Sequence, residues 1–183
     1  MGNQNSSSQK TAVNVDSQLD DIIATLAKTL LAKRWRLSTA ESCTGGLVSA
    51  SITALAGSSE WFERGYITYS NQAKSEDIDV SQNLIEQFGA VSDQVARAMA
   101  LGAKQNSGSD IALSITGIAG PSGGSPGKPV GTVCFAWVLS NDQMISETKH
   151  FDGDRQQIRQ QACDFSLRKL LDLLRIQQSV SKL

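Results

Sequence analysis

Hydrophobic residues follow helical spacing near both ends of the chain. From Leu19 to Leu31 they recur three or four positions apart, which predicts an amphipathic helix that begins near Ser17. The same spacing extends from Asp154, a residue type favoured at a helix N-terminus, to Leu174. The pattern therefore predicts a long helix at the start of the folded region and another at its end.

Shorter segments between these helices switch between strand-like and helix-like patterns. Strands are predicted over residues 35–40, 65–69, 110–116, 132–139 and 144–151, and helices over residues 44–56, 71–79, 81–88 and 92–106. The segment 110–116 is almost continuously apolar, which is typical of a central strand. Ser140, Asn141 and Asp142 favour a hairpin between the last two strands. This mixture predicts an α/β fold in which helices flank a mixed sheet.

The composition is that of an ordinary globular protein. The length of 183 residues suits one domain, and 40% of the residues are hydrophobic while 19% are charged. Residues 1–17 are polar and lack apolar periodicity. We therefore expect a disordered tail over residues 1–17 and a single domain over residues 18–178.

Charge and cysteine content argue against several classes of protein. The chain has 17 basic and 18 acidic residues, a net charge of −1, and no basic block, which disfavours nucleic-acid binding. No apolar run approaches the roughly 18–20 residues that span a bilayer. Cys43, Cys134 and Cys163 are widely spaced and odd in number, which disfavours disulfides and zinc and indicates a reducing, cytoplasmic location. A single histidine excludes a multi-histidine metal site.

The first candidate for chemistry is the segment T-A-E-S-C-T-G-G at residues 39–46, where a predicted strand leads into a helix. Ser42 lies at this junction, and the first backbone N–H groups of a helix have no partner within it. They can hold an anion, or the oxyanion that forms when a hydroxyl attacks a carbonyl. The alternative is that Ser42 or Thr44 merely caps the helix, and the spacing alone favours it because the segment is not G-x-S-x-G.

The second candidate is Y-S-N-Q-A-K at residues 69–74, which also follows a strand and should therefore lie at the same sheet edge as Ser42. A serine nucleophile needs a base, and Lys74 and His150 are the candidates. A lysine base has to lower its pKa by ~3 units from ~10.4, which costs ~4 kcal/mol and requires burial or a cationic neighbour. Tyr69 is placed to pass the proton or orient the amine. The alternative is an exposed lysine on a short helix.

Two further segments favour ligand binding. The Gly- and Pro-rich residues 115–131 fail the phosphate-loop pattern, because Ser122 stands at the first glycine position and Pro129 follows Lys128. Long loops of this kind at a strand end are often functional, although a plain connector is the alternative.

Arg155 is predicted in the first turn of the last helix, where its charge opposes the helix dipole. It therefore suggests a phosphate or carboxylate ligand, with a surface arginine as the alternative.

Taken together, these segments resemble the CinA C-terminal domain family from about residue 19 to residue 174. The resemblance rests on six ordered stretches: T-A-E-S-C-T-G-G, G-S-S-E-W-F-E-R-G-Y-I-T-Y-S-N-Q-A-K, G-A-V-S, S-I-T-G-I-A-G-P, K-P-V-G-T-V and F-D-G-D-R. It implies a three-layer α/β/α fold with a mixed sheet of about five strands. It also implies hydrolysis of the carboxamide of nicotinamide mononucleotide to nicotinate mononucleotide and ammonia, in pyridine nucleotide salvage.

The resemblance further implies that Ser42 is the nucleophile, Lys74 the base and Tyr69 a supporting residue, with no metal or other cofactor. The expected binding residues are Thr44, Gly45 and Gly46 for the oxyanion, Thr116, Gly117, Ala119 and Gly120 for the pyridine and ribose, Arg155 for the phosphate, and Asn71 and Ser92 as further pocket members. A homodimer is expected, without nucleic-acid or membrane partners. The alternatives are a non-catalytic protein that binds a protein partner, and a serine amidase for another small amide.

Overall fold

The computed structural model describes residues 13–180, and the side chains of residues 18–177. Its sheet has five strands in the order β2-β1-β3-β4-β5. The strands are β1 (Leu37–Glu41), β2 (Phe62–Ile67), β3 (Ile111–Gly117), β4 (Thr132–Val138) and β5 (Met144–His150). The helices are α1 (Val13–Lys33), α2 (Leu47–Thr53), the short 3-10 helix η1 (Ser58–Glu60), α3 (Asn71–Ile78), α4 (Gln82–Phe88), α5 (Asp93–Ser107) and α6 (Arg155–Val180).

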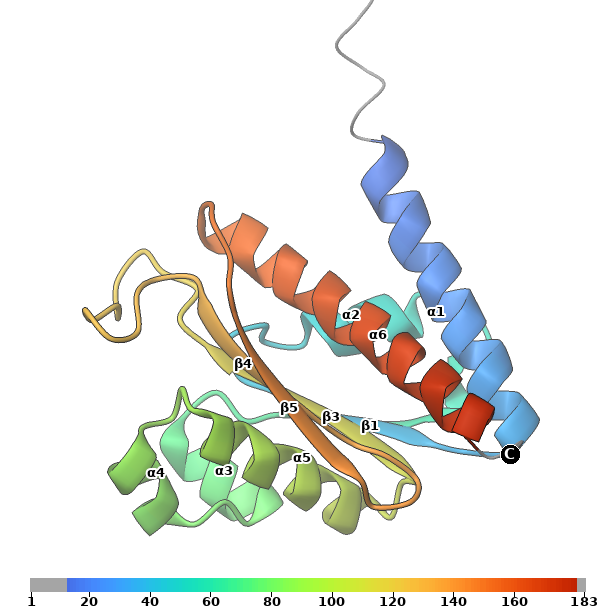
Figure 1. The fold of residues 1–183 in the computed structure, drawn as a ribbon, viewed down its shortest axis with the longest axis horizontal. Helices are drawn as coiled ribbons and strands as arrows, with labels where there is room; N and C mark the ends of the chain where they lie inside the picture. The colour runs from blue at the N-terminus through green and yellow to red at the C-terminus, as the bar shows by residue number, and fades with distance from the viewer. Residues whose placement is uncertain (1–12, 181–183) are drawn as a thin grey trace, which may run out of the picture.

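Helices cover both faces of this sheet. Figure 1 shows α1, α2 and α6 on one face and α3, α4 and α5 on the other. The first layer buries Leu26 and Leu170 against the sheet, and the second buries Ile78 and Met99. The predicted α/β fold, with three layers and a mixed five-stranded sheet, is therefore confirmed.

Strand directions explain where a ligand site can form. β1 is parallel to both of its neighbours, β2 and β3, whereas β3, β4 and β5 are antiparallel in turn. Residues 111–116 are buried, which confirms the expectation of a central strand, and the predicted hairpin joins β4 to β5. The connection from β1 to β2 runs through α2 on one face of the sheet, and the connection from β2 to β3 runs through α3, α4 and α5 on the other. A crevice is therefore expected at the carboxyl ends of β1, β2 and β3.

Two predicted boundaries at helix starts are wrong. α1 begins at Val13, so residues 13–17 are helical and do not belong to a disordered tail; the predicted tail at residues 1–12 lies outside the described residues. α2 begins at Leu47 instead of Thr44. The reason is a turn in which Gly45 and Gly46 adopt positive φ angles of 58° and 93°, which interrupt a right-handed helix.

The start of α6 is as predicted. The N–H of Gln157 donates to Asp154 Oδ1 at 2.9 Å, and the N–H of Asp154 donates to Gln157 Oε1 at 2.8 Å. This reciprocal pair satisfies donors that a helix N-terminus leaves free and fixes where α6 begins. None of the helices in the described part of the chain is long and apolar enough to cross a membrane.

Candidate active site

Ser42 lies immediately after β1, at the carboxyl end of the strand. Its side chain is buried, and its N–H donates to the carbonyl of Ile115 at 2.9 Å, which extends the pairing of β1 with β3 by one residue. The chain then turns through Gly45 and Gly46 into α2. The residue order thus places a hydroxyl at the sheet edge where β1, β2 and β3 end.

Lys74 reaches Ser42 from the segment that follows β2. Ser70 caps α3 by accepting the N–H of Ala73 at 3.0 Å, and Lys74 lies in the first turn of this helix. Its Nζ donates to Ser42 Oγ at 3.1 Å and to the Thr68 carbonyl at 2.9 Å, with the Ser70 carbonyl at 3.4 Å. The structure therefore brings together the two residues that the sequence predicts as nucleophile and base.

The surroundings of Lys74 favour a neutral amine. The side chain is 1% exposed, and its hydrogen-bond partners are uncharged oxygens. Burial lowers the pKa of Lys74 from 10.5 to about 8, because the charged form loses its hydration. This is the condition that sequence reasoning set for a lysine base.

His150 lies elsewhere on the sheet edge. It ends β5, which is separated from β1 by β3 and β4, and its side chain is half exposed. Its Nε2 lies 3.7 Å from Asp152 Oδ1, and no hydrogen bond joins it to Ser42 among the described residues. Geometry therefore places Lys74, and not His150, beside the Ser42 hydroxyl.

Cys43 is a poor candidate for a nucleophile. Its side chain is buried, and burial raises the pKa of its thiol to about 12. Only the thiolate is strongly nucleophilic, so this cysteine is inert at neutral pH.

The backbone donors of the turn differ from the expected set. The N–H of Gly45 donates to the Ser42 carbonyl at 3.1 Å, and the N–H of Gly46 donates to Glu41 Oε2 at 3.0 Å. Both groups are occupied, so the expectation that Gly45 and Gly46 supply oxyanion donors is wrong. No atom of another residue within 13–180 accepts the N–H of Cys43 or Thr44. These two amides follow Ser42 directly, and the N–H of Cys43 contacts the thiol of its own side chain.

Glu41 causes this difference, and sequence reasoning missed it. Its buried carboxylate accepts the N–H groups of Gly46, Val48 and Ser49 at 2.8–3.1 Å, and the Ser49 hydroxyl at 2.7 Å. It therefore caps α2 from the end of β1, five residues before the cap position at Gly46. An acidic residue inside an otherwise buried strand was the signal that could have revealed it.

Arg155 links two other segments of the site. Its Nη1 donates to the Gly120 carbonyl and its Nη2 to the Tyr69 hydroxyl, each at 2.9 Å. Tyr69 is 59% exposed, and the hydrogen bonds of Lys74 go to other partners, so the structure connects Tyr69 to Arg155 instead of to the amine. The expected support of Lys74 by Tyr69 is therefore not seen. No carboxylate within 4 Å pairs with Arg155 among the described residues.

Arg159, one helical turn after Arg155, was also missed. Its Nη2 donates to the Thr44 carbonyl at 2.6 Å, so it contacts the turn that carries Ser42. Its position four residues after Arg155, on the same side of a predicted helix, was the available signal.

Some expected pocket residues use their polar groups for structure. The Thr116 hydroxyl donates to the Ala90 carbonyl at 2.8 Å, and the Ser92 hydroxyl caps α5 by accepting the Val95 N–H at 3.3 Å. A side chain at Gly117 would contact the backbone of β4, so glycine is required for the strand pairing.

The other expected pocket residues are Ala119 and Gly120, in the loop after β3, and Asn71, at the start of α3. Ala119 is buried, and Gly120 offers its carbonyl to Arg155. Asn71 is exposed and lines a hollow of about 290 Å³ between α3 and α4, whose other lining residues do not include Ser42 or Lys74.

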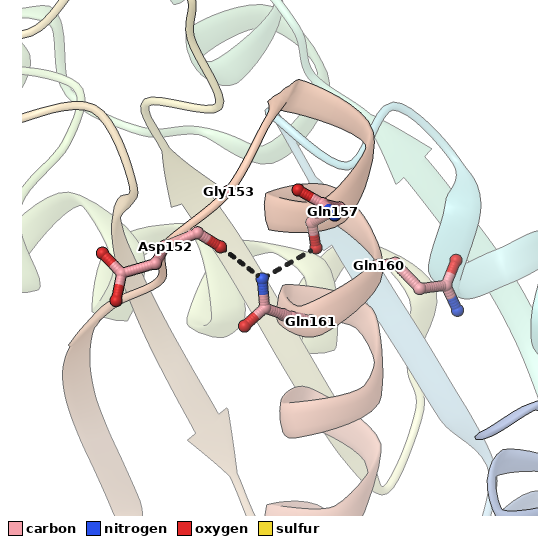
Figure 2. A pocket seen from close by; sticks show the side chains of 5 residues that line it. All are labelled: Asp152, Gly153, Gln157, Gln160 and Gln161. Atoms are coloured by element: carbon pink, nitrogen blue, oxygen red, sulfur yellow. Dashed lines mark hydrogen bonds between the residues drawn. The ribbon is translucent and has the colours of Figure 1, made fainter. Parts of the chain in front are cut away.

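A larger hollow, of about 480 Å³, lies at the start of α6. It is lined by Asp152, Gly153, Gln157, Gln160 and Gln161 (Figure 2). The side chain of Gln161 lies between Asp152 and Gln157 and donates to their carbonyls at 2.8 and 3.2 Å. None of the predicted site residues lines it. Within the described part of the chain, no group of three His, Cys, Asp or Glu residues is placed to hold a metal ion.

Comparison with known proteins agrees with this geometry. The model of the CinA C-terminal domain matches residues 19–174. Proteins named nicotinamide-nucleotide amidohydrolase PncC are 47% identical in Enterobacter agglomerans (85% of this chain, 95% of that protein) and 48% identical in Pseudomonas putida (84% and 98%). The crystal structure of a competence-damaged protein (CinA) superfamily protein from Escherichia coli superposes with a TM-score of 0.83 at 38% identity, covering 87% of this chain and 92% of that one. The chain belongs to the CinA C-terminal domain family.

Proposed function

We propose that this protein hydrolyses the carboxamide of nicotinamide mononucleotide to nicotinate mononucleotide and ammonia, with Ser42 as nucleophile and Lys74 as base. The observation that carries the proposal is the 3.1 Å hydrogen bond between Lys74 Nζ and Ser42 Oγ, made by a buried amine whose pKa is lowered to about 8. The relatives named nicotinamide-nucleotide amidohydrolase support the choice of substrate.

The reaction runs in two halves. Ser42 Oγ attacks the carboxamide carbon while neutral Lys74 takes its proton, and the N–H groups of Cys43 and Thr44 bind the resulting oxyanion. The intermediate collapses to an acyl-enzyme, and Lys74 returns the proton to the departing nitrogen as ammonia leaves. Water then attacks the acyl carbon, gives its proton to Lys74, and releases the carboxylic acid and the Ser42 hydroxyl.

Arg155 is the proposed phosphate ligand. Among the described residues, its guanidinium bonds only the neutral oxygens of Gly120 and Tyr69, so its charge remains available to an anion. In this arrangement Tyr69 supports the site by orienting Arg155. The segment from Thr116 to Gly120 ends β3 at the same sheet edge and lines the space for the pyridine and ribose.

The decisive experiment measures ammonia release from nicotinamide mononucleotide by the wild type and by Ser42→Ala, with a chelator present. We expect turnover by the wild type and none above background by Ser42→Ala. The matched control is Ser75→Ala, since the Ser75 hydroxyl on α3 donates a hydrogen bond to the Asn71 carbonyl and none to Ser42 or Lys74. No turnover by the folded wild type would refute the proposal, and equal turnover by Ser42→Ala would refute the serine mechanism.

Three wider expectations accompany this activity. The product is a pyridine nucleotide precursor, so the reaction belongs to pyridine nucleotide salvage in the cytoplasm. The catalytic unit is a single domain over residues 18–178. The protein forms a homodimer, which light scattering tests by a mass near twice the 19.6 kDa of one chain.

A further inference from the structure

Hydrogen bonds hold the turn that carries Ser42 at several of its backbone groups. The carbonyl of Ser42 accepts the N–H of Gly45, and the N–H of Gly46 donates to Glu41. The carbonyl of Thr44 accepts the N–H of Leu47 at 3.3 Å and Arg159 Nη2 at 2.6 Å. Among the described residues, no other residue bonds the N–H groups of Cys43 and Thr44 or the carbonyls of Cys43 and Gly45, so the two amides are the donors that the turn leaves available.

Within residues 13–180, Arg159 makes the one hydrogen bond from α6 to this turn. The helix is fixed against the sheet by buried residues on either side of the arginine, Ile158 and Ala162. Its guanidinium also lies against Gly45, where a Cβ would be 3.7 Å from Nη2. The contact therefore joins α6 to the turn in which Gly45 and Gly46 adopt positive φ angles.

The charge of Arg159 is not neutralised by an acidic side chain. No carboxylate lies within 4 Å of it among the described residues, and its Nε is buried without a hydrogen-bond partner in that part of the chain. A fixed positive charge thus lies beside the backbone that flanks the nucleophile. Such a charge favours a transition state in which an oxyanion develops nearby.

We propose that Arg159 is a positioning residue for the oxyanion site, which holds the Thr44 carbonyl so that the N–H groups of Cys43 and Thr44 face the reacting carbonyl. The Thr44 carbonyl and the Thr44 N–H belong to successive peptide planes that meet at its Cα, so fixing one restricts the other. This inference rests on the proposed function. It separates Arg159 from Arg155, which contacts Gly120 and Tyr69 and is assigned to the phosphate.

The test compares kcat and KM for nicotinamide mononucleotide and for nicotinamide riboside, which lacks the phosphate. Because removing an oxyanion donor typically costs 10²–10³-fold in kcat, we expect that displacing the two donors in Arg159→Gln costs about 10- to 100-fold on both substrates, with little change in KM. Arg159→Lys retains a donor for the Thr44 carbonyl and should recover part of the loss. Arg155→Gln should instead raise KM for the phosphorylated substrate alone.

Arg168→Gln is the matched control, because Arg168 lies on the same helix and pairs with Asp164 away from the turn. It should leave both constants unchanged. A rise in KM confined to the phosphorylated substrate in Arg159→Gln would overturn the proposal and make Arg159 a phosphate ligand. Unchanged kcat in a folded Arg159→Gln would also overturn it. If Arg159→Gln fails to fold, the same comparison of kcat and KM on the two substrates is made with Arg159→Lys.

A fluorophosphonate probe separates failure of this inference from failure of the proposed function. Ser42 Oγ attacks phosphorus and displaces fluoride, its proton passes to Lys74, and the phosphoryl oxygen occupies the oxyanion site. We expect labelling of Ser42 that is about tenfold slower in Arg159→Gln, a fraction of the 10²–10³-fold cost of a lost donor. Labelling of Ser42 without hydrolysis of nicotinamide mononucleotide would refute only the proposed substrate, and the proposed role of Ser42 would stand. Equal labelling rates would refute the role of Arg159.

Discussion

At the scale of single residues, Lys74 determines what the site can do. Its amine is buried, and its hydrogen bonds within the described part of the chain go to neutral oxygens of Ser42, Thr68 and Ser70. Burial therefore lowers its pKa to about 8. At pH 7 roughly a tenth of the molecules then carry a neutral amine, whereas an unperturbed lysine would be almost fully protonated.

The first prediction concerns the pH dependence of catalysis. Because only neutral Lys74 accepts the Ser42 proton, we expect kcat/KM to rise close to tenfold per pH unit below pH 8 and to level off above it. Lys74→Ala should abolish turnover, and His150→Ala should keep both the activity and the profile. Steady-state kinetics between pH 6 and pH 9 measure this. A flat profile, or equal losses in the two variants, would contradict the assignment of Lys74.

The second prediction concerns stability. The pKa of Lys74 is about 8 in the folded protein and 10.5 as its unperturbed value. Between pH 8 and pH 10.5 the unfolded chain binds more protons than the folded protein, so the contribution of Lys74 to the free energy of unfolding rises with pH. Below pH 8 the lysine is protonated in both states, and burying its charge costs the folded protein about 3 kcal/mol. Lys74→Met should therefore be more stable than the wild type at pH 7. This gain is smaller than the full penalty, because the variant leaves the Thr68 carbonyl without its hydrogen bond. The gain should disappear near pH 10.

Urea unfolding at the two pH values measures this difference. Lys28→Met is the control, because Lys28 is exposed and should show the same stability relative to the wild type at both pH values. An equal difference between Lys74→Met and the wild type at pH 7 and pH 10 would show that burial does not perturb the lysine.

At the scale of elements, the connection from β1 to α2 forms the turn that carries Ser42. α2 has seven residues and no side chain at its own cap position, because Gly46 stands there. Glu41 replaces that cap from the end of the preceding strand and joins strand, turn and helix through one buried carboxylate. The same contact removes the Gly46 N–H from the oxyanion site, so structure and chemistry depend on one residue.

The third prediction follows from this cap. Glu41→Gln replaces one acceptor oxygen by an NH₂ group that faces backbone donors, and hydrogen bonds to charged groups contribute about 1.5–3 kcal/mol each. We therefore expect a loss of about 2–4 kcal/mol in the free energy of unfolding and a lower kcat in the molecules that fold. Glu86→Gln, on the exposed side of α4, should change neither. Unaltered urea unfolding of Glu41→Gln would contradict the proposed cap.

At the scale of the whole molecule, the site is assembled from four segments that are far apart in the sequence. The turn after β1, the start of α3, the loop after β3 and the start of α6 meet at one edge of the sheet (Figure 1). The hydrogen bonds that join them connect residues 32, 35, 86 and 115 positions apart. The site therefore exists only in the folded chain.

The fourth prediction follows from this assembly. A ligand that binds only the folded state stabilises it by about 2.7 kcal/mol at 100 times its Kd. For a domain of this size, nicotinate mononucleotide at that concentration should raise Tm by about 5–10 °C. The increase should be much smaller for Arg155→Gln, which loses the proposed phosphate ligand, and unaffected by Arg168→Gln. Thermal unfolding followed by circular dichroism measures it, and an unchanged Tm would contradict binding of this product.

Local patterns in the sequence determined much of the fold. The apolar run at 111–116 identified the central strand, and the residue types at Asp154 and Ser92 identified two helix starts, because capping and burial depend on neighbours in sequence. The family resemblance added the pairing of Ser42 with Lys74, which spacing alone did not favour. The starts of α1 and α2 were missed, the second because Gly45 and Gly46 adopt positive φ angles and delay the helix to Leu47.

Tertiary structure decided which groups meet. The sequence left both Lys74 and His150 as candidate bases, and strand order brings Lys74 to Ser42 because β2, not β5, lies beside β1. It also linked Tyr69 to Arg155, and it brought Arg159 to Thr44 across 115 residues. The pKa of Lys74 depends on the same packing, because desolvation arises from the atoms that enclose the amine. Residue order thus specifies the elements, whereas their packing determines the distances and burial on which the proposed chemistry depends.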